Sequence, residues 1–161
     1  MTVVCNTSPI INLAAIEKLF LLQKIFNTII IPQSVFDEIV VRGKGLPGSK
    51  EVQESNWIIV QQVNNKALVT ALSEILDEGE AEAIALAVET NADLLLIDER
   101  KGRKIASRFE LNVLGLLGVI TIAKERKLIP SVREVLDELK TIAGFRISGT
   151  LYQYILLSVE E

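Results

Sequence analysis

Short runs dominated by apolar residues alternate with helical stretches along this chain, and that alternation constrains the fold more than any other feature. The clearest run is Leu94–Ile97, and others are Val3–Cys5, Thr28–Ile31, Trp57–Val63 and Val113–Leu114. Strands that are apolar on both sides are typical of parallel sheets that helices cover on each face. We therefore expect an α/β fold with a doubly wound, mainly parallel sheet of about five strands flanked by helices.

Helices are predicted between these strands from the spacing of their apolar residues. Ser8 before Pro9 is suited to cap the first helix, and Pro32 begins a helix that ends at Val41. The 161 residues contain no repeat, low-complexity tract or linker, so we expect one domain spanning residues 1–161. The other helices are expected at Leu19–Phe26, Ala67–Leu76, Glu80–Glu89, Lys101–Phe109, Ile120–Lys127, Val132–Ala143 and Leu151–Leu157.

The composition excludes several kinds of chemistry. The chain has no histidine and one cysteine, Cys5, which excludes histidine-ligated zinc, Ser-His-Asp and Cys-His catalysis, and an internal disulfide. No apolar stretch approaches the roughly 20 residues needed to span a membrane, and the beginning does not resemble a signal peptide. A single cysteine favours a reducing compartment, so we expect a cytoplasmic protein. The formal net charge of −4 means that nucleic acid must be bound locally or through metal.

Polar residues stand directly after two of the expected strands. Asn6 follows Val3–Cys5, and Asp98 follows Leu94–Ile97. Ligands of open parallel sheets bind at the carboxyl ends of the strands. If these two strands are neighbours, an amide and a carboxylate face each other across one crevice. Because Asn and Asp are also favoured helix caps, position alone leaves a ligand site and a capping role open.

Acidic residues on two expected helices extend this set. On the helix that begins at Pro32, Asp37 and Glu38 lie equally far from the centre of the apolar face, roughly 130° at about 100° per residue, so the pattern does not choose between them. Glu80 stands three residues after Asp77, which is the spacing of a capping box. Glu82 is expected at a solvated position of the same helix.

Five short motifs occur in a single order along the chain. They are Asn6-Thr7-Ser8-Pro9, Pro32-x-x-Val35-x-x-Glu38, Gly79-Glu80, Ala85-Leu86-Ala87, and four apolar residues followed by Asp98. This order resembles the PIN domain superfamily over nearly the whole chain. The resemblance is closest to a prokaryotic branch that is related to VapC-type toxins and often described only as PIN-like nucleic-acid-binding proteins. The segments Asp98–Arg103 and Gly144–Ser148 also resemble that branch.

The resemblance implies a set of metal-binding and catalytic acids. PIN domains hold acidic residues that bind Mg²⁺ or Mn²⁺ and hydrolyse RNA phosphodiesters. The second, third and fourth acidic positions fall on Glu38, Glu80 and Asp98, with Glu82 as a competitor for the third. The first position, usually aspartate, falls on Asn6. We expect these acids to be catalytic and, together with Asn6, to bind the metal.

The neighbours of these residues are expected to contact RNA. Thr7 and Ser8 match the hydroxyl-bearing residues that commonly follow the first position of the family. Four basic residues directly after Asp98 could contact a phosphate backbone, although a solvated helix face is the alternative interpretation. They are Arg100, Lys101, Arg103 and Lys104.

Asn6 separates two predictions of function. An amide oxygen can still bind a metal or a water, but it carries no charge, so the substitution should weaken metal binding. The first prediction is a metal-dependent endoribonuclease, with RNA as substrate, an antitoxin protein as a candidate partner and a homodimer as the expected assembly. The alternative is a catalytically weak or silent PIN-like module that binds RNA or a protein. A nucleotide-binding domain has only the fold in its favour, because Gly43–Gly48 follows a helix rather than a strand.

Overall fold

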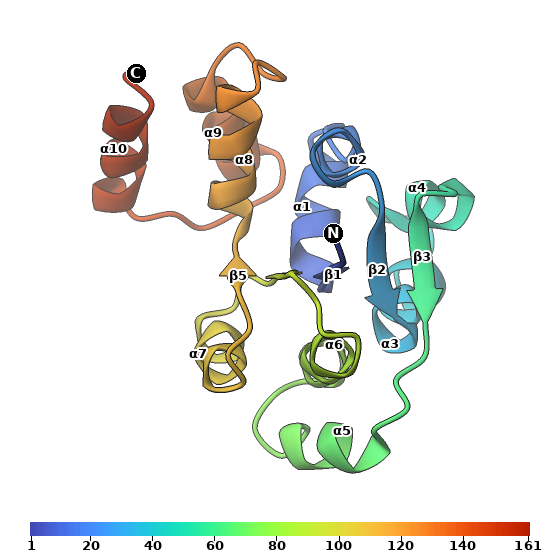
Figure 1. Ribbon diagram of the computed structural model, residues 1–161. Coiled ribbons are helices and arrows are strands. Elements are labelled where there is room, and N and C mark those ends of the chain that lie inside the picture. The colour runs from blue at the N-terminus through green and yellow to red at the C-terminus, as the bar shows by residue number, and fades with distance from the viewer.

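The computed structural model describes residues 1–161 and contains a five-stranded parallel sheet in the order β3-β2-β1-β4-β5 (Figure 1). Helices flank the sheet on both faces, so the prediction of a doubly wound parallel sheet is confirmed. The strands are β1 (Val3–Cys5), β2 (Ile29–Pro32), β3 (Ile58–Gln61), β4 (Leu94–Leu96) and β5 (Val113–Leu114).

Ten α-helices and one π-helix connect and cover the strands. No helix combines the length and the hydropathy that a membrane span requires. The first six elements are α1 (Thr7–Ala15), α2 (Phe20–Phe26), α3 (Gln33–Phe36), the π-helix η1 (Asp37–Arg42), α4 (Ser49–Glu54) and α5 (Lys66–Leu72). The remaining five are α6 (Glu78–Glu89), α7 (Arg100–Arg108), α8 (Leu116–Glu125), α9 (Val132–Thr141) and α10 (Gly149–Ser158).

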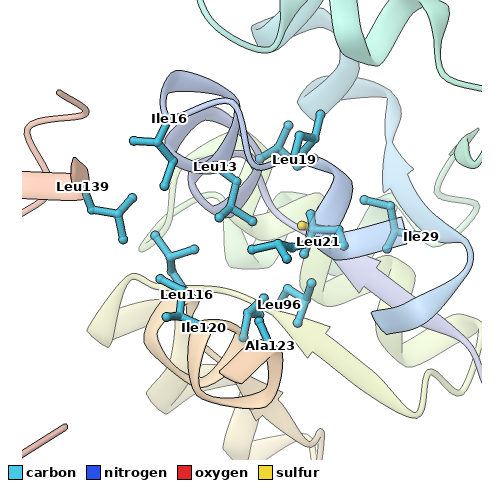
Figure 2. Packing of buried hydrophobic residues seen from close by; sticks show 14 of the residues in the cluster. Leu13, Ile16, Leu19, Leu21, Ile29, Leu96, Leu116, Ile120, Ala123 and Leu139 are labelled. Carbon is cyan, nitrogen blue, oxygen red and sulfur yellow. The ribbon is translucent and has the colours of Figure 1, made fainter. Parts of the chain in front are cut away.

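Each central strand buries both of its faces, as the apolar runs predict. Along β1, Val3 and Cys5 point into the larger apolar cluster, whereas Val4 points into the smaller one on the opposite face. The larger cluster joins the sheet to α1, α2, α8 and α9, and Figure 2 shows side chains from these helices and from β2 and β4 meeting in one interior. The smaller cluster joins the sheet to α5, α6 and α7. Burial of apolar surface on both faces fixes the sheet between two helical layers.

Two predicted helix starts are wrong, for identifiable reasons. Asn6, rather than Ser8, occupies the N-cap position of α1, and Ser8 lies inside the helix with its hydroxyl directed at Asp98. The helix α8 begins at Leu116, four residues before the predicted start. Gly118 lowers the local helix propensity, so the sequence pattern does not indicate this first turn. A Cβ on Gly118 would lie only 2.3 Å from the Leu114 side chain, so glycine is required for this approach of α8 to β5.

The helix predicted from Pro32 to Val41 is an α-helical turn followed by a π-helix. The π-helix covers Asp37–Arg42, and its wider turn departs from the 100° per residue of a regular α-helix. Its apolar residues Ile39 and Val40 are buried. A regular helical pattern therefore does not describe the directions of Asp37 and Glu38 in this segment.

The order of the strands creates a crevice between β1 and β4. From β1 the chain adds β2 and β3 on one side, and then crosses over to add β4 and β5 on the other. Open parallel sheets bind ligands at such a switch point, outside the carboxyl ends of the strands. The backbone N–H of Asn6 donates to the carbonyl of Leu96 at 2.9 Å, so the chain segments that leave β1 and β4 begin side by side.

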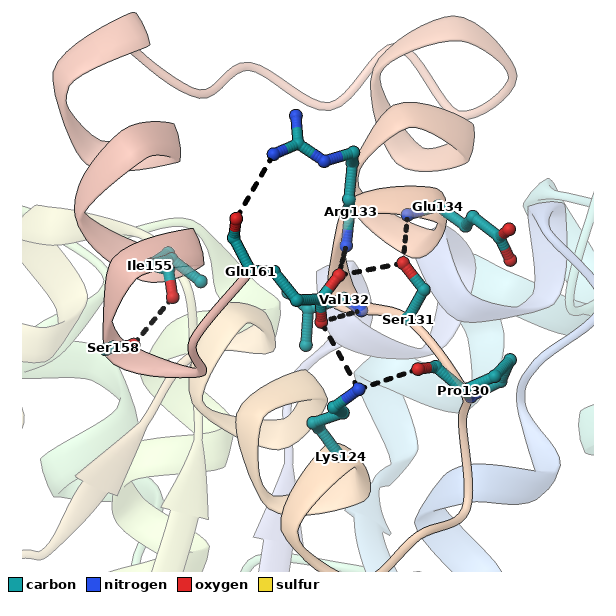
Figure 3. A network of polar contacts seen from close by, with 9 residues as sticks. All are labelled: Lys124, Pro130, Ser131, Val132, Arg133, Glu134, Ile155, Ser158 and Glu161. Atoms are coloured by element: carbon teal, nitrogen blue, oxygen red, sulfur yellow. Dashed lines mark hydrogen bonds and ion pairs between the residues drawn. The ribbon is translucent and has the colours of Figure 1, made fainter.

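A network around Glu161 holds the end of the described chain against α9 (Figure 3). Its carboxylate accepts hydrogen bonds from the Ser131 hydroxyl at 2.8 Å and from the backbone N–H groups of Val132 and Arg133 at 2.7 and 3.1 Å. Lys124 lies 3.5 Å from the same carboxylate. Burial raises the pKa of Glu161, but the N–H donors of the α9 N-terminus outweigh that effect and lower its pKa to about 2.

Candidate functional site

A cavity of about 820 Å³ opens at the switch point between β1 and β4. Residues from the ends of both strands line it, together with residues from η1 and from the starts of α1, α6, α7 and α8. The segment between α9 and α10 completes the wall. Eight of the predicted site residues line this cavity: Asn6, Thr7, Ser8, Glu38, Glu80, Asp98, Arg100 and Arg103.

The Asn6 side chain faces the cavity and does not cap its helix. Its backbone is extended, with φ −82° and ψ 177°, as at an N-cap, but its side chain accepts no capping hydrogen bond. The residue is only 7% exposed. A Cβ on Gly79 would lie 3.5 Å from Asn6 Oδ1 and 3.6 Å from Glu38 Oε2. An amide oxygen and a carboxylate oxygen from two distant elements therefore both approach the start of α6 at Gly79.

Glu38, and not Asp37, lines the cavity. The hydroxyl of Thr7 donates to Glu38 Oε2 at 2.7 Å, which ties the π-helix to the first turn of α1. Asp37 instead accepts a hydrogen bond from the Gln33 side chain at 3.0 Å, within its own helical segment. The tertiary contact with Thr7 therefore separates the two acids, which the helical pattern leaves equivalent.

Glu80 is a buried carboxylate with one oxygen that has no partner. Its backbone N–H donates to Asp77 Oδ1 at 2.8 Å, and Glu80 Oε1 accepts the N–H of Asp77 at 3.4 Å, so the predicted capping box is confirmed. Glu80 Oε2 is buried without a hydrogen bond, and the residue is 6% exposed. Burial, and next the hydrogen bond and negative charge of Asp77, raise the pKa of Glu80 to about 7.

Glu82 does not line the cavity, and the expectation that it is simply solvated is wrong. Its Oε1 accepts the backbone N–H of Ser34 at 3.1 Å. Ser34 lies in the first turn of α3, where N–H groups have no partner within the helix. Glu82 therefore serves as a tertiary cap for α3, and the two competitors for the third acidic position have different surroundings.

Asp98 is held by groups from two other elements. Its Oδ1 accepts the N–H of Leu116 at 2.6 Å, so it caps α8 rather than its own helix, and its Oδ2 accepts the Ser8 hydroxyl at 3.2 Å. Burial raises the pKa of Asp98, while these two donors and the positive charge of Arg103 oppose the increase. A Cβ on Gly115 would lie 3.0 Å from both Arg103 Nη1 and Asp98 Oδ1, so glycine allows this guanidinium and this carboxylate to flank the start of α8.

The four basic residues after Asp98 divide into two pairs. Arg100 and Arg103 line the cavity, whereas Lys101 and Lys104 are exposed and do not. The two ion pairs of the chain involve Lys18 and Lys124, so neither arginine forms an ion pair, although the charge of Arg103 acts on Asp98. Two guanidinium groups are therefore free to meet an anionic ligand at the cavity.

Several lining residues lack a predicted role at the site. Asp77 is identified in the sequence only as a helix cap, although its position two residues before Gly79 places it beside the cavity. Asn12 donates to the Ser8 hydroxyl at 3.1 Å, one helical turn along α1. Phe145 and Arg146 belong to the segment that carries part of the family resemblance, but no local pattern indicates that they return to the strand ends.

The donor set at the cavity consists of oxygen atoms. Asn6 contributes an amide, and carboxylates come from η1, α6 and the end of β4. No group of three or more acidic, histidine or cysteine side chains forms a ready metal cage. A cation that accepts one or two protein carboxylates and keeps several waters is therefore compatible with this arrangement, and Mg²⁺ has that preference.

Comparisons with known proteins agree with this architecture. No curated protein is detectably similar in sequence. A PilT N-terminus domain protein from the hyperthermophilic archaeon Sulfolobus solfataricus P2 has a similar structure, with a TM-score of 0.59 and 20% identity over 78% of this chain and 95% of the other. The sequence model of a PIN domain family matches residues 2–161. PIN domains are generally nucleases that use divalent metal ions. The chain belongs to the PIN domain family.

Proposed function

We propose that this chain is a metal-dependent endoribonuclease of the PIN type, which hydrolyses RNA phosphodiesters. The observation that carries the proposal is Glu80 Oε2, a buried carboxylate oxygen without a hydrogen-bond partner at the edge of the cavity. Buried polar atoms are rarely left unsatisfied, and a buried carboxylate oxygen without a donor is a position at which a cation can bind. Oxygen atoms of Asn6 and Glu38 approach Gly79, one residue before Glu80.

The residues present fit Mg²⁺ or Mn²⁺. Both ions prefer oxygen donors, and Mg²⁺ binds one or two carboxylates while it keeps several waters. Glu80, Glu38 and Asp98 would hold the ion directly or through water, and Asn6 would offer its amide oxygen. When bound, such an ion lowers the pKa of a coordinated water and neutralises charge that develops on the phosphate.

The side chains of the chain itself support proton transfer and positioning. Glu80 Oε2 has no hydrogen-bond partner, so this carboxylate is available to orient an attacking water or to accept its proton. The Thr7 hydroxyl fixes one oxygen of Glu38, and the Ser8 hydroxyl with the Leu116 N–H fixes both oxygens of Asp98.

The basic side chains support RNA rather than a neutral substrate. Arg100 and Arg103 lie at the cavity without carboxylate partners, and phosphate contacts by arginine position a nucleic-acid backbone. Lys101 and Lys104 are predicted to contact the nucleic-acid backbone as well, but they lie outside the cavity on the exposed surface, so this proposal gives them no role at the cavity.

Cleavage of labelled single-stranded RNA by purified protein in Mn²⁺ tests the proposal. We expect cleavage that EDTA abolishes and that Glu80→Gln and Asp98→Asn each reduce by at least 100-fold, as is common when a general acid–base group is lost. Glu82→Gln is the matched control, because it removes a carboxylate of the same helix that lies outside the cavity. Cleavage that persists in EDTA or in Asp98→Asn would exclude the assignment.

Asn6 favours one second candidate, a catalytically silent module that binds RNA or a protein partner. An uncharged ligand at the end of β1 lowers the affinity expected for a divalent cation. This candidate predicts no cleavage by the native chain and a gain of Mn²⁺-dependent cleavage in Asn6→Asp. Robust turnover by the native chain would exclude it. An antitoxin partner and a homodimer stay predictions, which co-purification and sedimentation velocity test.

A further inference from the structure

The cavity is larger than a hydrated metal ion requires. Six waters, at about 30 Å³ each, account for roughly 180 Å³, whereas the cavity measures about 820 Å³ and falls in the range of small-molecule sites. Apolar side chains from β5, α8, α10 and the connection between α9 and α10 also line the cavity. These belong to Leu114, Leu117, Phe145, Leu151 and Ile155.

The aromatic residue that lines the cavity, Phe145, is carried by a fixed segment. Gly144 has a φ of +70°, which lets the chain turn directly after α9, and the N–H of Phe145 donates to the Leu139 carbonyl at 2.9 Å. At the other end, the Ser148 hydroxyl caps α10 through the Leu151 N–H at 3.1 Å. Figure 1 shows this connection between α9 and α10 passing the start of α8. Phe145 is therefore held at the cavity wall from both sides.

Positive charge lies next to this apolar wall. Arg146 follows Phe145 directly, lines the cavity, is exposed and takes part in neither ion pair of the chain. Arg103 stands beside Asp98 at the start of α8. The cavity is therefore lined by carboxylates and an amide, by guanidinium groups outside the ion pairs of the chain, and by aromatic and aliphatic side chains. A ligand that joins an anionic group to a flat apolar group matches this combination of surfaces.

We propose that the apolar lining around Phe145 is a subsite for one unpaired base of the RNA, which stacks on Phe145 while Arg146 and Arg103 contact its flanking phosphates. This inference rests on the proposed function, because it assigns the substrate of the same cavity. A base has a π-face that stacks on aromatic side chains, and each such stack contributes strongly to the binding of single strands. Phe145 is a binding residue and Arg146 a phosphate contact; neither takes part in proton transfer.

Fluorescence anisotropy with short labelled RNAs tests the subsite separately from cleavage. Dissociation constants are measured in EDTA and again in Ca²⁺, for an intact RNA and for RNAs with a single abasic nucleotide at each position. We expect one abasic position to weaken binding by roughly five- to 150-fold, and Phe145→Ala to weaken binding of intact RNA to the same extent. When Phe145→Ala binds that abasic RNA, the two losses of affinity should not add, because the variant and the abasic nucleotide each remove the same stack.

Further variants separate stacking from folding. Phe145→Trp keeps a ring and should retain most of the affinity, whereas Phe145→Leu keeps an apolar side chain and should lose it. Phe20→Ala is the matched control, because Phe20 is an exposed aromatic residue of α2 outside this cavity. Circular dichroism verifies that each variant is folded.

The outcomes separate this inference from the proposed function. Any of four results would overturn the subsite, even if Mn²⁺-dependent cleavage occurs. These are equal affinities for all abasic and intact RNAs, additive losses when Phe145→Ala is combined with the abasic RNA, full affinity in Phe145→Leu, and no RNA binding by the wild-type chain. Base-dependent binding without any cleavage in Mn²⁺ would sustain the subsite and remove the nuclease activity.

Discussion

The raised pKa of Glu80 makes a quantitative prediction about folding. In the unfolded chain this carboxyl group ionises near its ordinary value of 4.5, whereas in the folded protein its pKa is about 7. Below pH 4.5 the group is protonated in both states, and its full contribution to stability is present. Between pH 4.5 and 7 only the folded state keeps the proton, so the free energy of unfolding falls as pH rises and levels off above pH 7. At about 1.4 kcal/mol per pH unit, the loss amounts to about 3 kcal/mol.

The substitution Glu80→Gln isolates this contribution. Glutamine keeps the side-chain oxygen that a capping box requires but does not titrate. We expect the unfolding free energy of Glu80→Gln, relative to wild type, to increase by about 3 kcal/mol between pH 4.5 and 8. For a chain of 161 residues this corresponds to a relative rise in melting temperature of roughly 6–12 °C. The absence of histidine leaves this pH range free of the residue that usually titrates there.

Urea unfolding in EDTA, followed by circular dichroism at intervals between pH 4.5 and 8.5, measures the difference. Glu78→Gln is the matched control, because Glu78 is exposed in the same helical turn. Its free energy of unfolding should vary with pH in the same way as that of wild type. The amide of glutamine can shift the free energy of unfolding by a constant amount, but such a shift does not change how the difference from wild type varies with pH. A difference between Glu80→Gln and wild type that stays flat across this range would refute the argument that burial holds the Glu80 carboxyl in its neutral form.

Three further predictions concern other carboxylates and Asn6. Asn6→Asp should increase the affinity for Mn²⁺ by roughly tenfold, about 1.4 kcal/mol, because it adds a charged ligand. Calorimetric titration measures this affinity, and an unchanged value would place Asn6 outside the metal site. Glu161→Gln should destabilise the protein by about 1 kcal/mol, because α9 loses N-terminal hydrogen bonds. This loss of stability should be present above pH 4.5 and should disappear as pH falls toward 2. Thermal melts with Glu160→Gln as control test it, and equal melting temperatures for Glu161→Gln and wild type would contradict it. Glu82→Ala should lower the free energy of unfolding by about 1–3 kcal/mol, because it leaves the Ser34 N–H unpaired, and it should not alter the affinity for Mn²⁺. A loss of Mn²⁺ affinity would indicate that Glu82 belongs to the metal site.

Much of the fold follows from patterns that are local in the chain. Apolar runs such as Leu94–Leu96 indicate strands buried on both faces, and the Asp77–Glu80 capping box lies within four residues. The cavity lies where the strand ends are expected to meet, since Asn6 and Asp98 come directly after strands and both line it. The fold class and the position of these two polar residues at the strand ends are therefore predictable from the sequence, whereas a ligand role for them stays a prediction.

The sequence by itself determined where polar residues leave the sheet, and the tertiary structure decided which of them share one cavity. Glu38 is separated from Asp37 by the Thr7 hydroxyl, and Glu80 from Glu82 by burial beside the cavity. Phe145 reaches the strand ends from the far end of the chain. The physical reason is that strand and cap signals depend on neighbours along the chain, whereas burial, pKa and side-chain contacts depend on residues brought together only when the sheet and its helices pack.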